Sequence, residues 1–184
     1  MGKVYECLEE TLQDFLRAQH VFFVGTAPLG ADGHVNVSPK GLDGFRVLGP
    51  KRVAYVDHPG SGIETVAHLR ENGRIVLMFC AFDGPPKIVR LYGRGRTVEP
   101  QDEEFPALLA RFAPRVVPRA IIDVDVERIA DSCGFGVPTY EYRGEREQLV
   151  EWADKKGPDV ESYLREKNAT SLDGLPGLRW VESK

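Results

Sequence analysis

The chain of 184 residues is long enough for one domain with a buried core, and its composition of 42% hydrophobic and 28% charged residues is ordinary for a globular protein. The formal net charge of −4 gives no electrostatic reason to expect nucleic-acid binding, and the longest apolar run, "IVLMFCAF", is too short to span a membrane. The first residues contain no apolar signal core, and three widely spaced cysteines favour reduced thiols over a disulfide framework. We therefore expect a single cytoplasmic domain over residues 1–184, with no nucleic-acid partner and no membrane partner.

The first half of the chain is predicted to be a helix followed by an antiparallel meander. Residues 4–18 place apolar side chains at helical spacing, whereas residues 20–40 form two β-rich runs joined by the turn-like stretch "LGADG". The runs "GFRVL" and "RVAYVD" continue the meander. A glycine-rich loop then leads into a short helix, which the pair Asn72 and Gly73 should end.

The second half is predicted to contain three further elements and a helical tail. "GRIVLMFCAF" is apolar at both odd and even positions, so both faces should be buried, in a barrel core or against a second subunit. The next strand contains Gly93 and Gly95, which indicate a bulge or a tight bend. A helix over roughly 101–112 precedes residues 119–129, where apolar residues alternate with acidic ones such as Asp123, as in a half-exposed strand.

These elements add up to six or seven strands joined mostly by short turns. Regular alternation of strands and helices is missing, which argues against a doubly wound parallel sheet. The sequence therefore predicts a mainly β fold, an antiparallel barrel with helices at its ends and in two crossings.

The stretch "VDHPGSGIETVAHL" has the local features of an anion-binding loop. Small residues Gly60, Ser61 and Gly62 let backbone N–H groups approach a ligand, and the following helix begins with unpaired N–H donors. Asp57 and Glu64 flank the loop, which contains no Lys or Arg, so a cation must come from elsewhere. A strand, a glycine turn and a helix also occur in many folds without any ligand, and that simpler interpretation stays open.

Other motifs exclude several chemistries. Four scattered histidines have no metal-ligand spacing, and we expect no metal site. Pro59 stands where a serine-hydrolase nucleophile elbow needs glycine. The tripeptide "NAT" at Asn168 matches a glycosylation acceptor, which we interpret as chance. The residues give no catalytic acid or base.

Four stretches taken in order, "HVNVSPKG", "RVAYVDHPGSGIETVAHLRENGRIVLMF", "GPPKIVRLYGRGR" and "DSCGFGVP", resemble the pyridoxamine 5′-phosphate oxidase-like family of FMN-binding split β-barrels. The resemblance covers about residues 20–140 and leaves about 145–184 as a helical C-terminal extension. It implies a six- to seven-stranded antiparallel split barrel that forms a homodimer, with FMN in a groove at the subunit interface. The loop phosphate would then be that of FMN.

The resemblance also implies a set of cofactor contacts. The isoalloxazine ring of FMN would lie beside the strand with "VNVSPK". In this strand, Lys40 matches a substrate-binding lysine of the vitamin B6 oxidases. Those oxidases carry Ser-Arg-Lys in the phosphate loop and an arginine where this chain has Val35, so Lys87 or Arg90 is expected to supply the missing cation, from this chain or its partner. The predicted contacts are Asn36, Val37, Ser38, Lys40, Val56, Asp57, Ser61, Gly62, Glu64, Thr65, Lys87 and Arg90.

Each of these contacts has a simpler role open to it. The three cations would by default be solvated surface charges. Thr65 could cap the helix, Ser61 could turn the chain, and Glu64 could be a favourable acid in the first helical turn.

The reaction is less defined than the cofactor. Vitamin B6 oxidases hold substrate with a C-terminal Trp and Arg, which are absent from the matching residues 132–136. We therefore expect an FMN-dependent oxidoreductase that passes hydride or electrons to or from a small substrate other than a B6 vitamer. The alternative is a non-catalytic carrier or sensor of flavin, deazaflavin F420 or a tetrapyrrole. The tail "KNATSLDGLPGL" could close over the flavin of the partner or form a surface clasp.

Overall fold

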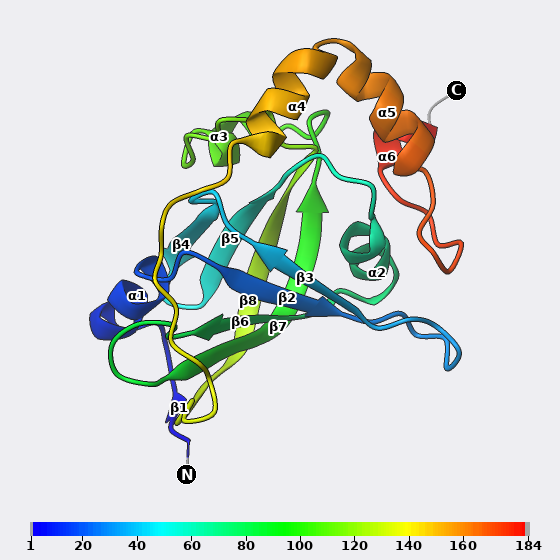
Figure 1. Ribbon diagram of the computed structural model, residues 1–184. Helices are drawn as coiled ribbons and strands as arrows, with labels where there is room; N and C mark the ends of the chain where they lie inside the picture. Colours follow the sequence, from blue (N-terminus) through cyan, green and yellow to red (C-terminus); the bar gives the residue numbers. More distant parts are fainter. Residues whose placement is uncertain (1, 183–184) are drawn as a thin grey trace.

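The computed structural model describes residues 2–182 and shows one strongly curved antiparallel sheet with helices at its ends (Figure 1). The strands pair in the order β3-β2-β6-β7-β8-β5-β4, and β1 pairs with β8. This half-barrel confirms the predicted split barrel, although the short β1 brings the sheet to eight strands. The strands are β1 (Val4–Tyr5), β2 (Phe22–Thr26), β3 (Asn36–Lys40), β4 (Phe45–Gly49), β5 (Arg52–Asp57), β6 (Arg74–Cys80), β7 (Ile88–Val98) and β8 (Ala120–Ser132).

The helices cover the ends of the sheet. They are α1 (Glu10–Arg17), α2 (Glu64–Asn72), α3 (Phe105–Leu109), α4 (Gln148–Lys156), α5 (Asp159–Lys167) and α6 (Arg179–Glu182). The main core lies between the curved strands, α1 and α2, and it includes Leu12 and Leu16 of α1 and Val66 of α2. A smaller cluster around Phe105 and Phe112 lies against β5 and β8. Because β2 and β7 alternate buried and less buried residues, one face of each strand enters the core.

Several local predictions are confirmed. The expected hairpin is present as β2 and β3, which pair antiparallel. Helix α2 ends at Gly73, whose φ of 70° places it in the left-handed region and whose N–H donates to the Leu69 carbonyl. The expected bulge lies between Tyr92 and Gly93, and a Cβ at Gly93 would overlap the Asp125 carbonyl. Close approach of two backbones therefore explains the glycine.

Two predicted helices are wrong at their boundaries. Residues 4–18 split into a strand and a helix, because Val4 pairs with Ala130 of β8, a long-range contact that local periodicity does not reveal. The helix predicted over 101–112 is reduced to α3. Turns precede α3, and beyond Leu109 the backbone forms tighter bonds to the third residue before, from Arg111 N to Leu108 O and from Phe112 N to Leu109 O.

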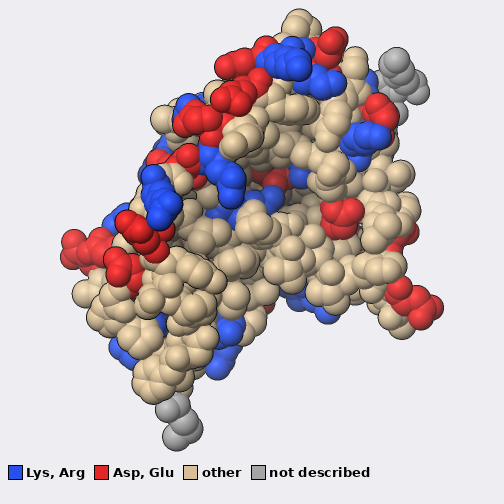
Figure 2. Space-filling model, in the orientation of Figure 1, with Lys and Arg blue, Asp and Glu red and all other residues tan. Residues whose placement is uncertain are grey.

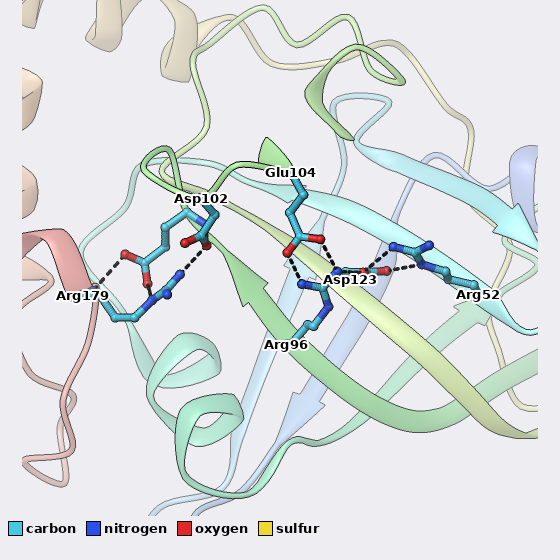
Figure 3. A network of polar contacts seen from close by, with 7 residues as sticks. Arg52, Arg96, Asp102, Glu104, Asp123 and Arg179 are labelled. Atoms are coloured by element: carbon cyan, nitrogen blue, oxygen red, sulfur yellow. Dashed lines mark hydrogen bonds and ion pairs between the residues drawn. The ribbon is translucent and has the colours of Figure 1, made fainter. Parts of the chain in front are cut away.

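The predicted exposure of Asp123 is also wrong. This carboxylate is buried and accepts two hydrogen bonds from Arg52, at 2.9 and 2.8 Å, and one from Arg96, at 2.5 Å (Figure 3). Both arginines come from the strands that flank β8, so a central strand can bury an acidic side chain because its neighbours supply the counter-charges.

The C-terminal extension folds back onto the sheet. Helices α4 and α5 arch over one end of the barrel, and the chain then returns beside α2 (Figure 1). Leu178 is buried in the main core, and Arg179 forms ion pairs with Glu99 and Asp102 (Figure 3). Within residues 2–182, no helix has the length and apolar character needed to cross a bilayer.

Candidate functional site

A pocket of about 310 Å³ lies where the end of β3, the β5–α2 loop and α4 meet. Figure 2 shows a hollow beneath the arch of α4 and α5, with charged side chains in its floor. Leu149 of α4 lines the pocket, so the C-terminal extension contributes to its wall. Six predicted cofactor contacts also line it: Ser38, Lys40, Val56, Gly62, Glu64 and Thr65.

A buried ion triplet fixes two cations at this pocket. Asp57, the last residue of β5, is 0% exposed, and its two oxygens accept hydrogen bonds from Lys40 Nζ at 2.7 Å and Arg119 Nε at 2.8 Å. Burial by itself would raise the pKa of Asp57, but the charges of Arg119 and Lys40 outweigh it and hold the pKa well below its usual range. The carboxylate is therefore ionised, and it orients both cations.

Arg119 uses its other nitrogens to reach the glycine loop. Its Nη1 donates to the Gly60 carbonyl at 3.0 Å and to Asn168 Oδ1 at 2.8 Å. Among the described residues, none accepts a hydrogen bond from Nη2, and Arg119 lines the pocket. A guanidinium that is held at Nε and Nη1 and keeps a free donor at Nη2 is suited to binding an anion.

The loop itself adds backbone donors. Ser61 and Gly62 are exposed, and no acceptor for their N–H groups occurs within residues 2–182. Helix α2 follows with no side-chain cap at its N-terminus, so its first-turn N–H groups also lack a side-chain acceptor. Glu64 lies in this turn, and its carboxylate accepts the Leu172 N–H at 3.3 Å. Asp57 and Glu64 thus balance the two cations, and attraction for an anion must come from directed donors more than from net charge.

Asn36 connects β3 to α2 beside the pocket. Its amide donates to Thr65 Oγ1 at 3.0 Å and to Thr26 Oγ1 at 3.3 Å, and it accepts a bond from Ser38 Oγ at 3.2 Å. Val37 lies on the opposite face of β3 and is 65% exposed. These contacts hold β3 against α2 and the end of β2.

His58 lies in the β5–α2 loop, and His68 lies in α2. His58 lines the pocket, and burial lowers the pKa of its ring, which favours the neutral form. His68 is fully buried, and its Nδ1 lies 3.0 Å from Thr26 Oγ1. Within residues 2–182, no group of three or more His, Cys, Asp or Glu side chains could hold a metal ion.

Two predicted cations lie away from the pocket of their own chain. The Lys87 ammonium lies over the rings of Tyr5 and Phe15, at 5.6 and 5.1 Å from their centroids. Arg90 donates to Ser132 Oγ at 3.1 Å. Neither lines the pocket, so their predicted contact with the cofactor could be made only through a partner subunit.

Sequence reasoning missed the two residues that complete the loop. Arg119 directly precedes β8, and nothing in its neighbourhood along the chain connects it to Asp57. In the sequence, Asn168 is notable only as part of a match to a glycosylation acceptor. In the structure it is fully buried and hydrogen-bonds to Gly60 and Arg119. Burial of its amide agrees with the interpretation of that motif as chance.

Comparisons with known proteins agree with this architecture. A family model described as "Pyridoxamine 5'-phosphate oxidase" matches residues 8–133. A "Pyridoxamine 5'-phosphate oxidase family protein ustO" of Aspergillus flavus is 40% identical over 193 residues, which cover 95% of this chain and 77% of the relative.

Two solved structures show the same fold. A variant of HupZ from Group A Streptococcus has a TM-score of 0.54 at 22% identity, covering 68% of this chain and 99% of that chain. A putative pyridoxamine 5′-phosphate oxidase from Lactobacillus delbrueckii has a TM-score of 0.52 at 20% identity, covering 69% and 98%. Such low identities show the fold alone. The family model and the 40% identical relative show more, and the chain belongs to the pyridoxamine 5′-phosphate oxidase family.

Proposed function

We propose that this protein binds FMN and acts as an FMN-dependent oxidoreductase on a small substrate other than a B6 vitamer. The observation that carries the proposal is the set of unused donors around the glycine loop. Arg119 Nη2 and the Gly62 N–H have no acceptor among the described residues, and both residues line the pocket, whereas Ser61, which lies between Gly60 and Gly62, does not. These donors fit a phosphate monoester, which needs several charge-assisted hydrogen bonds.

The size of the pocket supports a shared site. A volume of about 310 Å³ lies at the lower end of the roughly 300–1,000 Å³ of small-molecule sites, so one chain would hold only part of FMN. Val35 and Val37, beside or on the edge strand β3, are 74% and 65% exposed. On β6, Val76 and Met78 are half-buried in the single chain, on the face that the sequence predicts to be covered. A second copy of the chain would cover such surfaces and complete the site.

The residues around the pocket would have different roles in binding FMN. FMN, when bound, supplies the transfer of hydride or electrons. Arg119 and the glycine loop would hold the phosphate of FMN. Asn36 and Ser38, which are hydrogen-bonded to each other on β3, would lie beside the isoalloxazine ring. Lys40, fixed by Asp57, would hold a positive charge at a set place in the pocket.

The substrate is expected to differ from that of the vitamin B6 oxidases. Ser132 accepts a hydrogen bond from Arg90, and neither the Trp nor the Arg of those oxidases occurs in residues 132–136. Without that cation, a substrate phosphate would lack a charge-assisted partner. A small substrate without a phosphate group suits the site better.

The test is a comparison of flavins. Purified protein should bind FMN in about one copy per chain, riboflavin more weakly because it has no phosphate, and FAD more weakly because the phosphate would be buried against the loop. Titration followed by absorbance and fluorescence gives the three dissociation constants. Equal affinity for FMN and riboflavin would refute phosphate recognition, and a protein that takes up no flavin would refute the whole proposal. Reduction of bound FMN by NADH or NADPH, followed in the visible spectrum, separates an oxidoreductase from a carrier.

A further inference from the structure

The C-terminal extension reaches the glycine loop through one side chain. Asn168 follows α5, lies outside the segment matched by the family model, and is 0% exposed. Its amide Nδ2 donates to the Gly60 carbonyl at 3.0 Å, and its Oδ1 accepts from Arg119 Nη1 at 2.8 Å. One side chain thus contacts both sources of the proposed phosphate donors.

The backbone around Asn168 prevents the amide from moving freely. Its N–H donates to the Leu164 carbonyl at 2.8 Å, and its carbonyl accepts from the Leu178 N–H at 3.0 Å. A Cβ at Gly177 would overlap that same carbonyl, so the returning chain lies directly against it. Leu178 in turn is buried in the main core. Both ends of the segment are therefore anchored, and the buried amide is held by its own two hydrogen bonds to Arg119 and Gly60.

Holding the Gly60 carbonyl also sets the direction of a donor. The Gly60 carbonyl and the Ser61 N–H belong to one planar peptide unit, and the described residues contain no cis peptide bond. In a trans peptide these two groups point in opposite directions. With its oxygen fixed by Asn168 and Arg119, the peptide directs the Ser61 N–H away from the guanidinium, so Asn168 would act on an anion held by Arg119 through the guanidinium itself and through the position of the loop that leads to Gly62.

We propose that Asn168 is a positioning residue for phosphate recognition, acting through the Gly60 carbonyl and the Arg119 guanidinium. The inference rests on the proposed binding of FMN. Removal of the amide leaves the Gly60 carbonyl with one donor and leaves Arg119 Nη1 with one acceptor, so the peptide and the guanidinium gain freedom that phosphate binding must then remove.

The experiment compares Asn168→Ala with the matched control Asp173→Ala. Asp173 belongs to the same returning segment and accepts bonds from His34 N at 2.8 Å and His34 Nδ1 at 2.6 Å, without contacting the loop. We expect Asn168→Ala to lower the affinity for FMN about tenfold, while the affinity for riboflavin changes by less than about twofold. Asp173→Ala should leave both affinities unchanged, because it loosens the segment at a distance from the phosphate donors.

A second variant covers the case in which Asn168→Ala does not fold. Asn168→Asp keeps an acceptor for Arg119 but loses the donor to Gly60 and adds a negative charge beside the guanidinium. This variant should lower the affinity for FMN at least about tenfold and leave the affinity for riboflavin nearly unchanged. An equal decrease in the affinities for FMN and riboflavin would overturn the inference, and so would the same decrease in Asp173→Ala. Either result would show that the returning segment stabilises the fold without positioning the phosphate donors.

Failure of the proposed function has a different signature. If the parent protein binds neither flavin, amide hydrogen exchange at residues 60–63 of the ligand-free protein decides the positioning role. Faster exchange there in Asn168→Ala than in the parent and in Asp173→Ala supports positioning of the loop. Identical exchange in all three proteins overturns it.

Discussion

Replacement of Arg119 by glutamine removes one of the two cations that hold the buried Asp57 carboxylate. Asp57 is 0% exposed and would keep only Lys40, so Arg119→Gln should lower the free energy of unfolding by about 3–5 kcal/mol. Asp57→Asn should cost a comparable amount, because it leaves two neighbouring cations without their shared carboxylate. The double variant Asp57→Asn/Arg119→Gln leaves only Lys40, whose side chain is 19% exposed, without its carboxylate. The stability that it loses should therefore fall short of the sum of the two single losses by at least about 2 kcal/mol.

Urea unfolding of the four proteins, followed by circular dichroism, measures this coupling. Arg52→Gln is the matched control, because Asp123 keeps Arg96 and the Arg52 side chain is 45% exposed (Figure 3). It should cost no more than about 1 kcal/mol. Strictly additive effects of the two substitutions at Asp57 and Arg119 would show that the triplet does not act as a unit.

The same proteins separate stability from ligand binding. In the double variant the stability recovers in part, but the free Nη2 donor of Arg119 is still missing. FMN affinity should therefore remain about tenfold to a hundredfold below that of the parent. Recovery of FMN affinity together with stability would refute the assignment of Arg119 as a phosphate ligand.

Three further predictions concern pH, packing and assembly. The native pKa of Asp57 is lowered, so its contribution to stability is complete above the unfolded pKa of about 3.9 and is lost as the pH falls through the native pKa. The stability difference between the parent and Asp57→Asn should thus shrink from about pH 5 to about pH 2, and a constant difference in urea unfolding would contradict the cause given. Gly93→Ala should destabilise by about 3 kcal/mol, the upper part of the usual range for overpacking, since a Cβ would overlap the Asp125 carbonyl. Gly30→Ala, with open space around it, should change thermal stability little. Light scattering should give twice the chain mass of 20.5 kDa, and a monomer at micromolar concentration would refute the homodimer.

Local sequence determined most of the elements of this fold. β-rich runs bounded by turn residues predicted β2 and β7, and glycines in the chain predicted the bulge at Gly93 and the helix end at Gly73. The loop at Gly60–Gly62 was also predictable, because small residues before a helix are a local pattern. All of these signals come from residues close together in the chain.

Tertiary structure alone decided which charges meet. Asp123 reads as exposed from its alternation with apolar neighbours, yet strands on both sides of β8 bring arginines to it. Arg119 meets Asp57 across 62 residues, and Asn168 meets Gly60 across 108. A side-chain hydrogen bond depends on the positions of both partners in space, which strand register and the path of the returning tail determine. The sequence could therefore predict the glycine loop and the absence of a cation within it, but only the folded chain shows that Arg119 lies against that loop.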